Sequence, residues 1–187
     1  MKKTLLIVLA VAAIIAGTWY ADHATKLSVT RASVKLGTAP APHTALAGKP
    51  APDLKFKDLN GKDVALSDLK GKVVFLNFWA TWCPPCVEEA ASLEALQKHI
   101  APLGGTVLGV SIDDSQPAYE DFLKQYGLTY PTFRDTTKKI PLTYGTVMYP
   151  DTYIIDRQGK LVRKIIGAQD WTSPQMTASV DAILAQH

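Results

Sequence analysis

Cysteine is scarce in this chain, whose 187 residues include only two, Cys83 and Cys86, three positions apart. A bridge between them would close too short a loop to hold a fold together, because the entropic benefit of a cross-link grows with loop length. The pair is therefore interpreted as a redox or metal-binding motif, not as a structural staple.

Histidine is also sparse, and the sequence predicts no metal site and no cofactor. A tetrahedral zinc site would need two more Cys or His ligands. Copper(I) could take two thiolates, but Met and His are absent near the pair. The four histidines are isolated from one another in sequence: His23, His43, His99 and His187.

The chain has no stripe of like charge. Its formal net charge is +3, with Lys and Arg scattered among Asp and Glu, so nucleic-acid binding is not expected. With 47% hydrophobic residues, the composition is that of a globular protein, and one folded core is predicted.

A targeting segment is predicted at the amino terminus, where Lys2 and Lys3 precede an apolar run from Leu5 to Ala21. No good cleavage site follows, so residues 1–21 are expected to form an uncleaved, single-pass anchor in the inner (cytoplasmic) membrane. A cleaved signal peptide is the alternative. The Ala-, Thr-, Ser- and Pro-rich residues 22–48 are interpreted as a flexible stalk, which would place the remaining domain in the periplasm or outside the cell.

Residues 49–187 alternate between strand-like and helix-like patterns. Val73–Trp79 is a continuous apolar run typical of a buried strand, and Pro84–Ile100 has apolar residues at helical spacing. The other expected strands are 54–57 and 64–66, paired around Asn60-Gly61, then 107–112, 152–156 and 161–166; the other expected helices are 117–126 and 173–185. This order predicts an α/β domain whose mixed central sheet is flanked by helices on both faces, with an N-terminal hairpin and a central insertion.

The position of the cysteines, between a buried strand and a helix, predicts different roles for them. Cys83 is expected to project from the sheet edge into solvent, where helix-start amides and the helix dipole would stabilise its thiolate. It would attack a partner's disulfide, and Cys86, one turn further on, would resolve the mixed disulfide. Trp82, beside the nucleophile, is expected to touch the substrate, whereas Trp79 reads as a core residue.

The run from Asn77 to Cys86, NFWATWCPPC, resembles the active-site sequence of the TlpA, ResA and CcmG group of membrane-anchored, thioredoxin-like proteins. The resemblance covers about residues 51–187 and implies a thioredoxin-like fold. The stretch from Gly145 to Asp156, with Asp151 directly after Pro150, is similar to the cytochrome c maturation branch.

The resemblance also implies roles for other residues. Pro150 is expected to have a cis peptide bond, to lie against the cysteines, and to expose the backbone of Tyr149 for pairing with an extended substrate; Pro131 is expected to be trans. A carboxylate at Glu89 would move the proton of the deeper thiol, in place of the buried Asp that classical thioredoxins have where this chain has Asn77. The alternative for Glu89 is a surface residue that supports the first turns of the helix. Asp151 is expected either to set the polarity of the substrate groove or to cap a turn.

The function expected first is reduction of disulfides in exported proteins, with apocytochrome c as the suspected substrate and a membrane thiol carrier as electron donor. An oxidase or isomerase would use the same residues in the opposite electron direction. A thiol peroxidase is a further alternative, disfavoured because Ala80 stands where peroxiredoxins have Thr. A non-catalytic peptide- or copper-binding module is the last.

Overall fold

The computed structural model describes residues 47–57 and 61–186. The predicted anchor and nearly all of the predicted stalk lie outside the described residues, as does Asn60 of the expected hairpin turn. None of the helices within the described ranges has the length and apolar character needed to cross a membrane.

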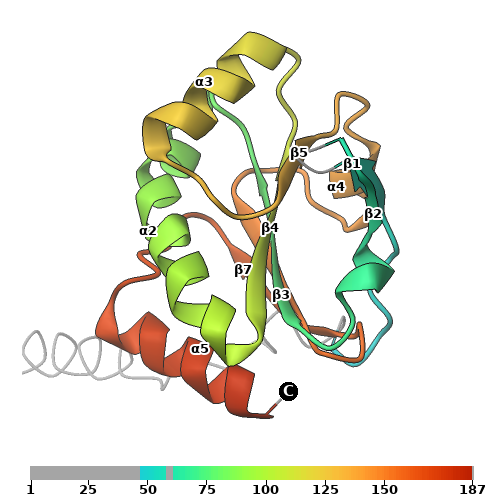
Figure 1. The fold of residues 1–187 in the computed structure, drawn as a ribbon, viewed down its shortest axis with the longest axis vertical. Coiled ribbons are helices and arrows are strands. Elements are labelled where there is room, and N and C mark those ends of the chain that lie inside the picture. Colours follow the sequence, from blue (N-terminus) through green and yellow to red (C-terminus); the bar gives the residue numbers. More distant parts are fainter. Residues whose placement is uncertain (1–46, 58–60, 187) are drawn as a thin grey trace, which may run out of the picture. The chain divides into compact units, whose positions relative to one another are not determined.

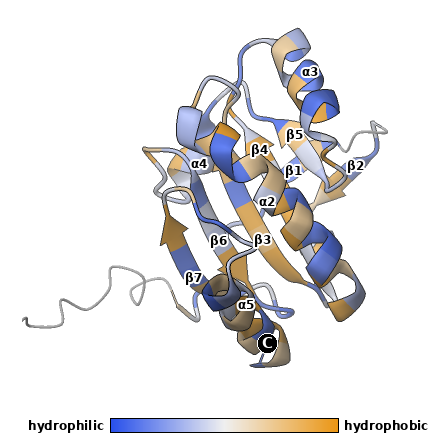
Figure 2. Ribbon diagram, turned by 90° about the vertical axis from the view of Figure 1, so that its left-hand side faces the viewer, coloured by the Kyte–Doolittle hydropathy of each residue, from blue (hydrophilic) through white to orange (hydrophobic). Residues whose placement is uncertain are grey.

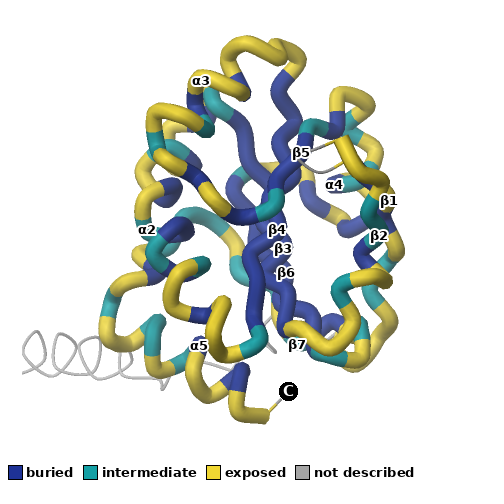
Figure 3. The backbone as a smooth tube through the Cα atoms, viewed as in Figure 1, coloured by how far each residue is buried: buried dark blue, intermediate teal, exposed yellow. Residues whose placement is uncertain are grey.

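A five-stranded mixed sheet forms the centre of the domain, with the strand order β5-β4-β3-β6-β7 (Figure 1). Strands β3, β4 and β5 run parallel, while β6 is antiparallel to β3 and β7 is antiparallel to β6. The strands are β3 (Val73–Trp79), β4 (Gly105–Ser111), β5 (Thr132–Arg134), β6 (Asp151–Ile155) and β7 (Leu161–Ile166). All residues of β3 and β4 are buried, which explains the apolar run along β3 (Figures 2 and 3).

The three longer helices pack against one face of this sheet. These are α2 (Pro84–Ile100), α3 (Gln116–Tyr126) and α5 (Pro174–Gln186), and η3 (Ala101–Leu103) follows α2. Their apolar side chains share one core cluster with Phe75 and Val107 of the sheet; among them are Leu93, Phe122 and Val180.

Smaller elements cover the opposite face of the sheet. It carries the hairpin of β1 (Lys55–Lys57) and β2 (Asp63–Ala65), the short η2 (Leu66–Leu69) and the five-residue α4 (Lys139–Thr143). Phe56 of the hairpin stacks on Phe133 with ring centroids 4.4 Å apart. Helices therefore lie on both faces, but a hairpin does much of the covering on this one.

The predicted elements are present, and their ends lie within two residues of the predicted ones. Both hairpins form, and α3 is capped by Ser115, whose side chain accepts a hydrogen bond from the amide of Ala118. The central insertion contains β5 and α4, which the sequence did not predict as elements.

Candidate active site

The two cysteines lie where β3 ends and α2 begins. Cys83 is the N-cap residue of α2, Cys86 lies in its first turn, and the two form a disulfide. The chain leaves β3 at Trp79, whose carbonyl oxygen accepts a hydrogen bond from the amide of Ile112, 3.0 Å away at the end of β4. The motif is thus fixed to two adjacent parallel strands.

The expectation that Cys83 projects into solvent is wrong for this oxidised state. Cys83 is 5% exposed and Cys86 is 3% exposed, so exposure hardly distinguishes them. The reason is that the disulfide turns the Cys83 sulfur toward the helix, and its Sγ also lies 3.6 Å from the carbonyl oxygen of Tyr149. Their different roles rest on position instead, since Cys83 precedes the helix and Cys86 is inside it.

The helix start has fewer free amides than the sequence argument assumed. Pro84 and Pro85 are the first two helical residues and have no N–H group. The amide of Val87 donates to the Cys83 carbonyl oxygen at 3.1 Å. The Cys86 amide is therefore the first helical donor available to a Cys83 thiolate, and thiolate stabilisation by this helix end stays a prediction.

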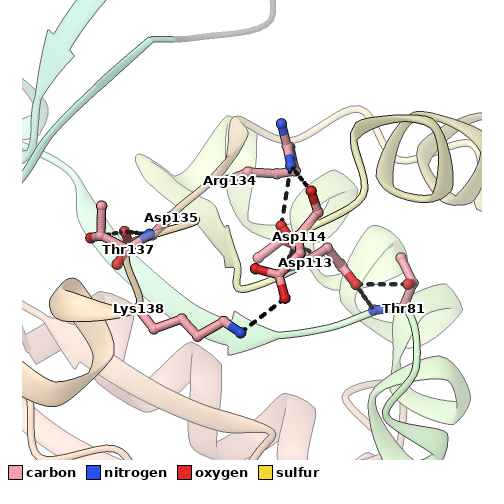
Figure 4. A network of polar contacts seen from close by, with 8 residues as sticks. Thr81, Asp113, Asp114, Arg134, Asp135, Thr137 and Lys138 are labelled. Atoms are coloured by element: carbon pink, nitrogen blue, oxygen red, sulfur yellow. Dashed lines mark hydrogen bonds and ion pairs between the residues drawn. The ribbon is translucent and has the colours of Figure 1, made fainter.

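Asp113 anchors the loop that leads to the cysteines, a role that the sequence analysis missed. The amide and hydroxyl of Thr81 donate to its carboxylate, the hydroxyl at 2.7 Å (Figure 4). The Ser111 hydroxyl donates to the same carboxylate at 2.6 Å. Arg134 donates to the backbone oxygens of Asp113 and Asp114. A sequence signal for this role was available. Asp113 follows a predicted buried strand, β4, that runs parallel to β3, and the carboxyl ends of parallel strands meet at the same edge of a sheet.

The peptide bond between Tyr149 and Pro150 is cis, as predicted, and it is the only cis bond among the described residues. The bond before Pro131 is therefore trans, also as predicted. Residues 144–150, between α4 and β6, form the cis-Pro loop. This loop lies against the disulfide, because the Tyr149 carbonyl oxygen closely approaches the Cys83 sulfur.

Exposed apolar side chains border the disulfide. Trp82 is 62% exposed, and Val147 and Met148 in the cis-Pro loop are exposed as well. Ile166 joins them, because it pairs with Asp151 in the sheet and the amide of the next residue donates to the carbonyl oxygen of Pro150. We call Trp82, Val147, Met148 and Ile166 the apolar rim; contact of Trp82 and Tyr149 with substrate stays a prediction.

Glu89 is buried beneath the motif, one helical turn from Cys86, and only 2% of its surface is exposed. Burial raises its pKa from 4.5 to about 7, because the ionised form loses its hydration. Hydrogen bonding from Trp171, followed by interactions with Gln169 and Asn77, opposes this shift. A carboxyl with this pKa is suited to proton transfer near neutral pH, which fits the predicted role.

Asp151 is held in a buried ion pair with Lys164. The sequence analysis expected it to set the polarity of the substrate groove or to cap a turn, and did not predict this pair. Its carboxylate lies 2.7 Å from Lys164 Nζ and accepts a hydrogen bond from the Thr146 hydroxyl at 2.8 Å. The residue is strand-bound in β6 and only 3% exposed, so it does not cap a turn. Contact with substrate stays a prediction for Asp151, and the visible function of its carboxylate is to tie β6 to β7.

A redox-active disulfide at a strand-to-helix junction, facing a cis-Pro loop, defines a thiol-disulfide oxidoreductase of the thioredoxin fold. Residues 47–164 match the AhpC/TSA family model. The thiol-disulfide oxidoreductase ResA of Bacillus thuringiensis (strain Al Hakam) is 43% identical over 122 residues, covering 65% of this chain and 70% of that protein. ResA of Bacillus subtilis is 39% identical over 120 residues, covering 64% and 67%. The chain belongs to the AhpC/TSA family and to its ResA-like thiol-disulfide oxidoreductases.

Solved structures agree with this assignment. The thioredoxin domain of a thiol-disulfide oxidoreductase from Bacteroides vulgatus superposes with a TM-score of 0.64 at 26% identity, covering 73% of this chain and 97% of that chain. A thiol:disulfide interchange protein of the thioredoxin family from Chlorobium tepidum TLS gives a TM-score of 0.62 at 29% identity, covering 74% and 94%. The predicted thioredoxin-like fold is confirmed.

Proposed function

We propose that this oxidoreductase reduces disulfides of exported proteins outside the cytoplasm, and that its substrate is apocytochrome c, whose haem-attachment cysteines must be thiols. Electrons would come from a membrane thiol carrier. The observation that carries the proposal is the disulfide of Cys83 and Cys86 at the start of α2, bordered by the apolar rim.

The apolar rim supports an extended polypeptide as the substrate. Trp82 directly precedes Cys83, and Met148 directly precedes Tyr149, whose carbonyl oxygen lies 3.6 Å from the Cys83 sulfur. Large exposed apolar side chains of this kind mark protein-binding surfaces. An unfolded segment with apolar residues beside its cysteine would bury them there. A folded partner would need a matching apolar patch around its own disulfide.

The extracytoplasmic location is supported by sequence. The lysines and apolar run of residues 1–21 have the pattern of an export signal or anchor. The Asp that follows Pro150 supports the cytochrome c maturation branch by resemblance.

Trapping the physiological partner tests the proposal. In the full-length Cys86→Ser variant, Cys83 can still attack a substrate disulfide, but the mixed disulfide is not resolved. We expect mass spectrometry of cells that express this variant to find apocytochrome c joined to Cys83. The Cys83→Ser variant is the matched control, because it retains one thiol at the site but lacks the attacking sulfur.

The identity of the trapped adduct separates the alternatives. A different exported protein would overturn the cytochrome substrate, and a cytosolic adduct would overturn the location. Equilibration of the purified protein with glutathione tests the direction. A potential near that of strongly oxidising periplasmic enzymes, about −120 mV, would exclude the reductase function in favour of an oxidase or isomerase.

A further inference from the structure

Trp171 makes the strongest of the hydrogen bonds that lower the pKa of Glu89, ahead of those from the Gln169 backbone and the Asn77 side chain. Its indole Nε1–H donates to Glu89 Oε1. The two residues are 82 positions apart in sequence and come from different elements: Glu89 lies on α2, and Trp171 lies in the loop 167–173 between β7 and α5.

The position of the Trp171 ring is fixed by packing and by the loop that carries it. The ring is 2% exposed and meets Phe75 of β3 edge to face, with centroids 5.9 Å apart. The loop is tied to α2 by the Ser92 hydroxyl, which lies 2.9 Å from the Glu89 carbonyl oxygen and 3.2 Å from that of Gln169. The indole donor is therefore oriented before Glu89 ionises.

The second carboxyl oxygen of Glu89, Oε2, has no hydrogen-bond partner among the described residues, although it is buried. Glu89 also lines a cavity of about 260 Å³ between α2 and the loop, together with Glu88, Ser92, Ala168, Gln169 and Asp170. No residue of the apolar rim lines this cavity. Glu89 thus lies at the wall of a cavity on a side of the site that the apolar rim does not share.

We propose that Trp171 is a positioning residue for the thiol-disulfide chemistry: it holds Oε1 of Glu89 and leaves Oε2 as the atom that takes the proton from Cys86 and returns it through the cavity beside α2. In this step the S–H bond of Cys86 breaks, the proton bonds to Oε2, and the thiolate attacks the Cys83 sulfur of the mixed disulfide, releasing the substrate thiolate. The inference applies to either electron direction and does not depend on the proposed substrate.

Few other charged groups face Glu89. The cavity adds the carboxylates of Glu88 and Asp170, and the buried phenol of Tyr130 lies near enough for the Glu89 charge to raise its pKa. No cationic side chain contributes to the pKa of Glu89 within the described ranges. The Trp171 donor is therefore the largest of the interactions that favour the ionised form.

The Trp171→Phe variant tests this role by direct titration of Glu89, followed by the NMR resonance of its side-chain carboxyl carbon in ¹³C-labelled oxidised protein. Loss of a hydrogen bond to a charged acceptor should raise the pKa of Glu89 by about one to two units. The pH profile of the Cys86-dependent resolution step, measured by single turnover, should shift in the same direction.

Trp79→Phe is the matched control. Trp79 is a second buried tryptophan, and its indole Nε1 has no hydrogen-bond partner in the described structure. This variant loses a similar volume from the same core cluster without removing a donor from Glu89. Its Glu89 pKa should stay at the wild-type value, and equal shifts in the two variants would overturn the proposal.

The unmodified protein offers a test that does not depend on folding of a variant. The indole N–H resonance of Trp171 should titrate with the Glu89 midpoint near 7 in the wild-type protein, and this titration should vanish in Glu89→Gln. An indole resonance that does not follow Glu89 would show that the hydrogen bond is absent in solution and would likewise overturn the proposal.

Discussion

Replacing Glu89 by Gln should stabilise the oxidised domain at alkaline pH and leave it nearly unchanged at acidic pH. Burial raises the pKa of Glu89 from 4.5 to about 7, so the folded state holds a proton that the unfolded state releases above pH 4.5. The free energy of unfolding therefore decreases as the pH rises from 4.5 to about 7, and it levels off once both states are ionised.

The size of this loss follows from the shift. The two pKa values differ by about 2.5 units, and each unit corresponds to about 1.4 kcal/mol, which gives a loss of about 3–4 kcal/mol. Because Glu89 is almost fully buried, solvent screening reduces this figure little. Gln resembles the protonated carboxyl in shape and charge, so the variant should keep the stability that the wild type loses.

Urea unfolding, followed by tryptophan fluorescence from pH about 5 to about 8, measures this difference. Both proteins stay oxidised, so the thiols do not titrate. The other titrating groups are common to both and cancel when the variant is compared with the wild type at each pH. Parallel stability curves would refute the reasoning, because they would show that Glu89 has an ordinary pKa in the folded state.

Three further changes have outcomes set by contacts in the structure. Gly109→Ala should lower the free energy of unfolding by about 1–3 kcal/mol in a thermal melt, since a Cβ atom would lie 2.7 Å from Thr132 Oγ1 in the closely packed sheet. Asp151→Asn should cost about 3 kcal/mol in urea unfolding, because Lys164 would lose the partner of a largely buried ion pair. Trp82→Ala should leave stability within about 0.5 kcal/mol but lower kcat/KM for a protein disulfide by about tenfold, with no change for a small disulfide, if this exposed side chain binds polypeptide.

Local pattern was sufficient for the main elements and for the redox motif. The continuous apolar run at Val73–Trp79 predicts a strand buried on both faces, and the structure has one there. Pro84 marks the start of α2 because proline is tolerated in the first helical turn. These inferences succeed because the determining residues are adjacent in sequence.

Features that depend on distant segments could not be predicted in the same way. The Tyr149 carbonyl oxygen that lies against the Cys83 sulfur is 66 positions away, and Trp171, which donates a hydrogen bond to Glu89, is 82 positions away. The anchoring of Thr81 by Asp113 spans 32 positions. In each case the contact depends on which segments the fold makes neighbours, and not on a pattern of adjacent residues.

The proton chemistry of the site follows from what Asn77 cannot do. Its amide is fully buried and donates to Thr152 at 3.0 Å, while its Oδ1 has no partner among the described residues. A neutral amide accepts no proton from Cys86 in the pH range of the reaction. Glu89 is then the ionisable group one helical turn from that thiol. A cationic partner would keep Glu89 ionised well below neutral pH. Burial, opposed first by the Trp171 indole and then by Gln169 and Asn77, instead holds its pKa near 7, where it can both accept and release a proton.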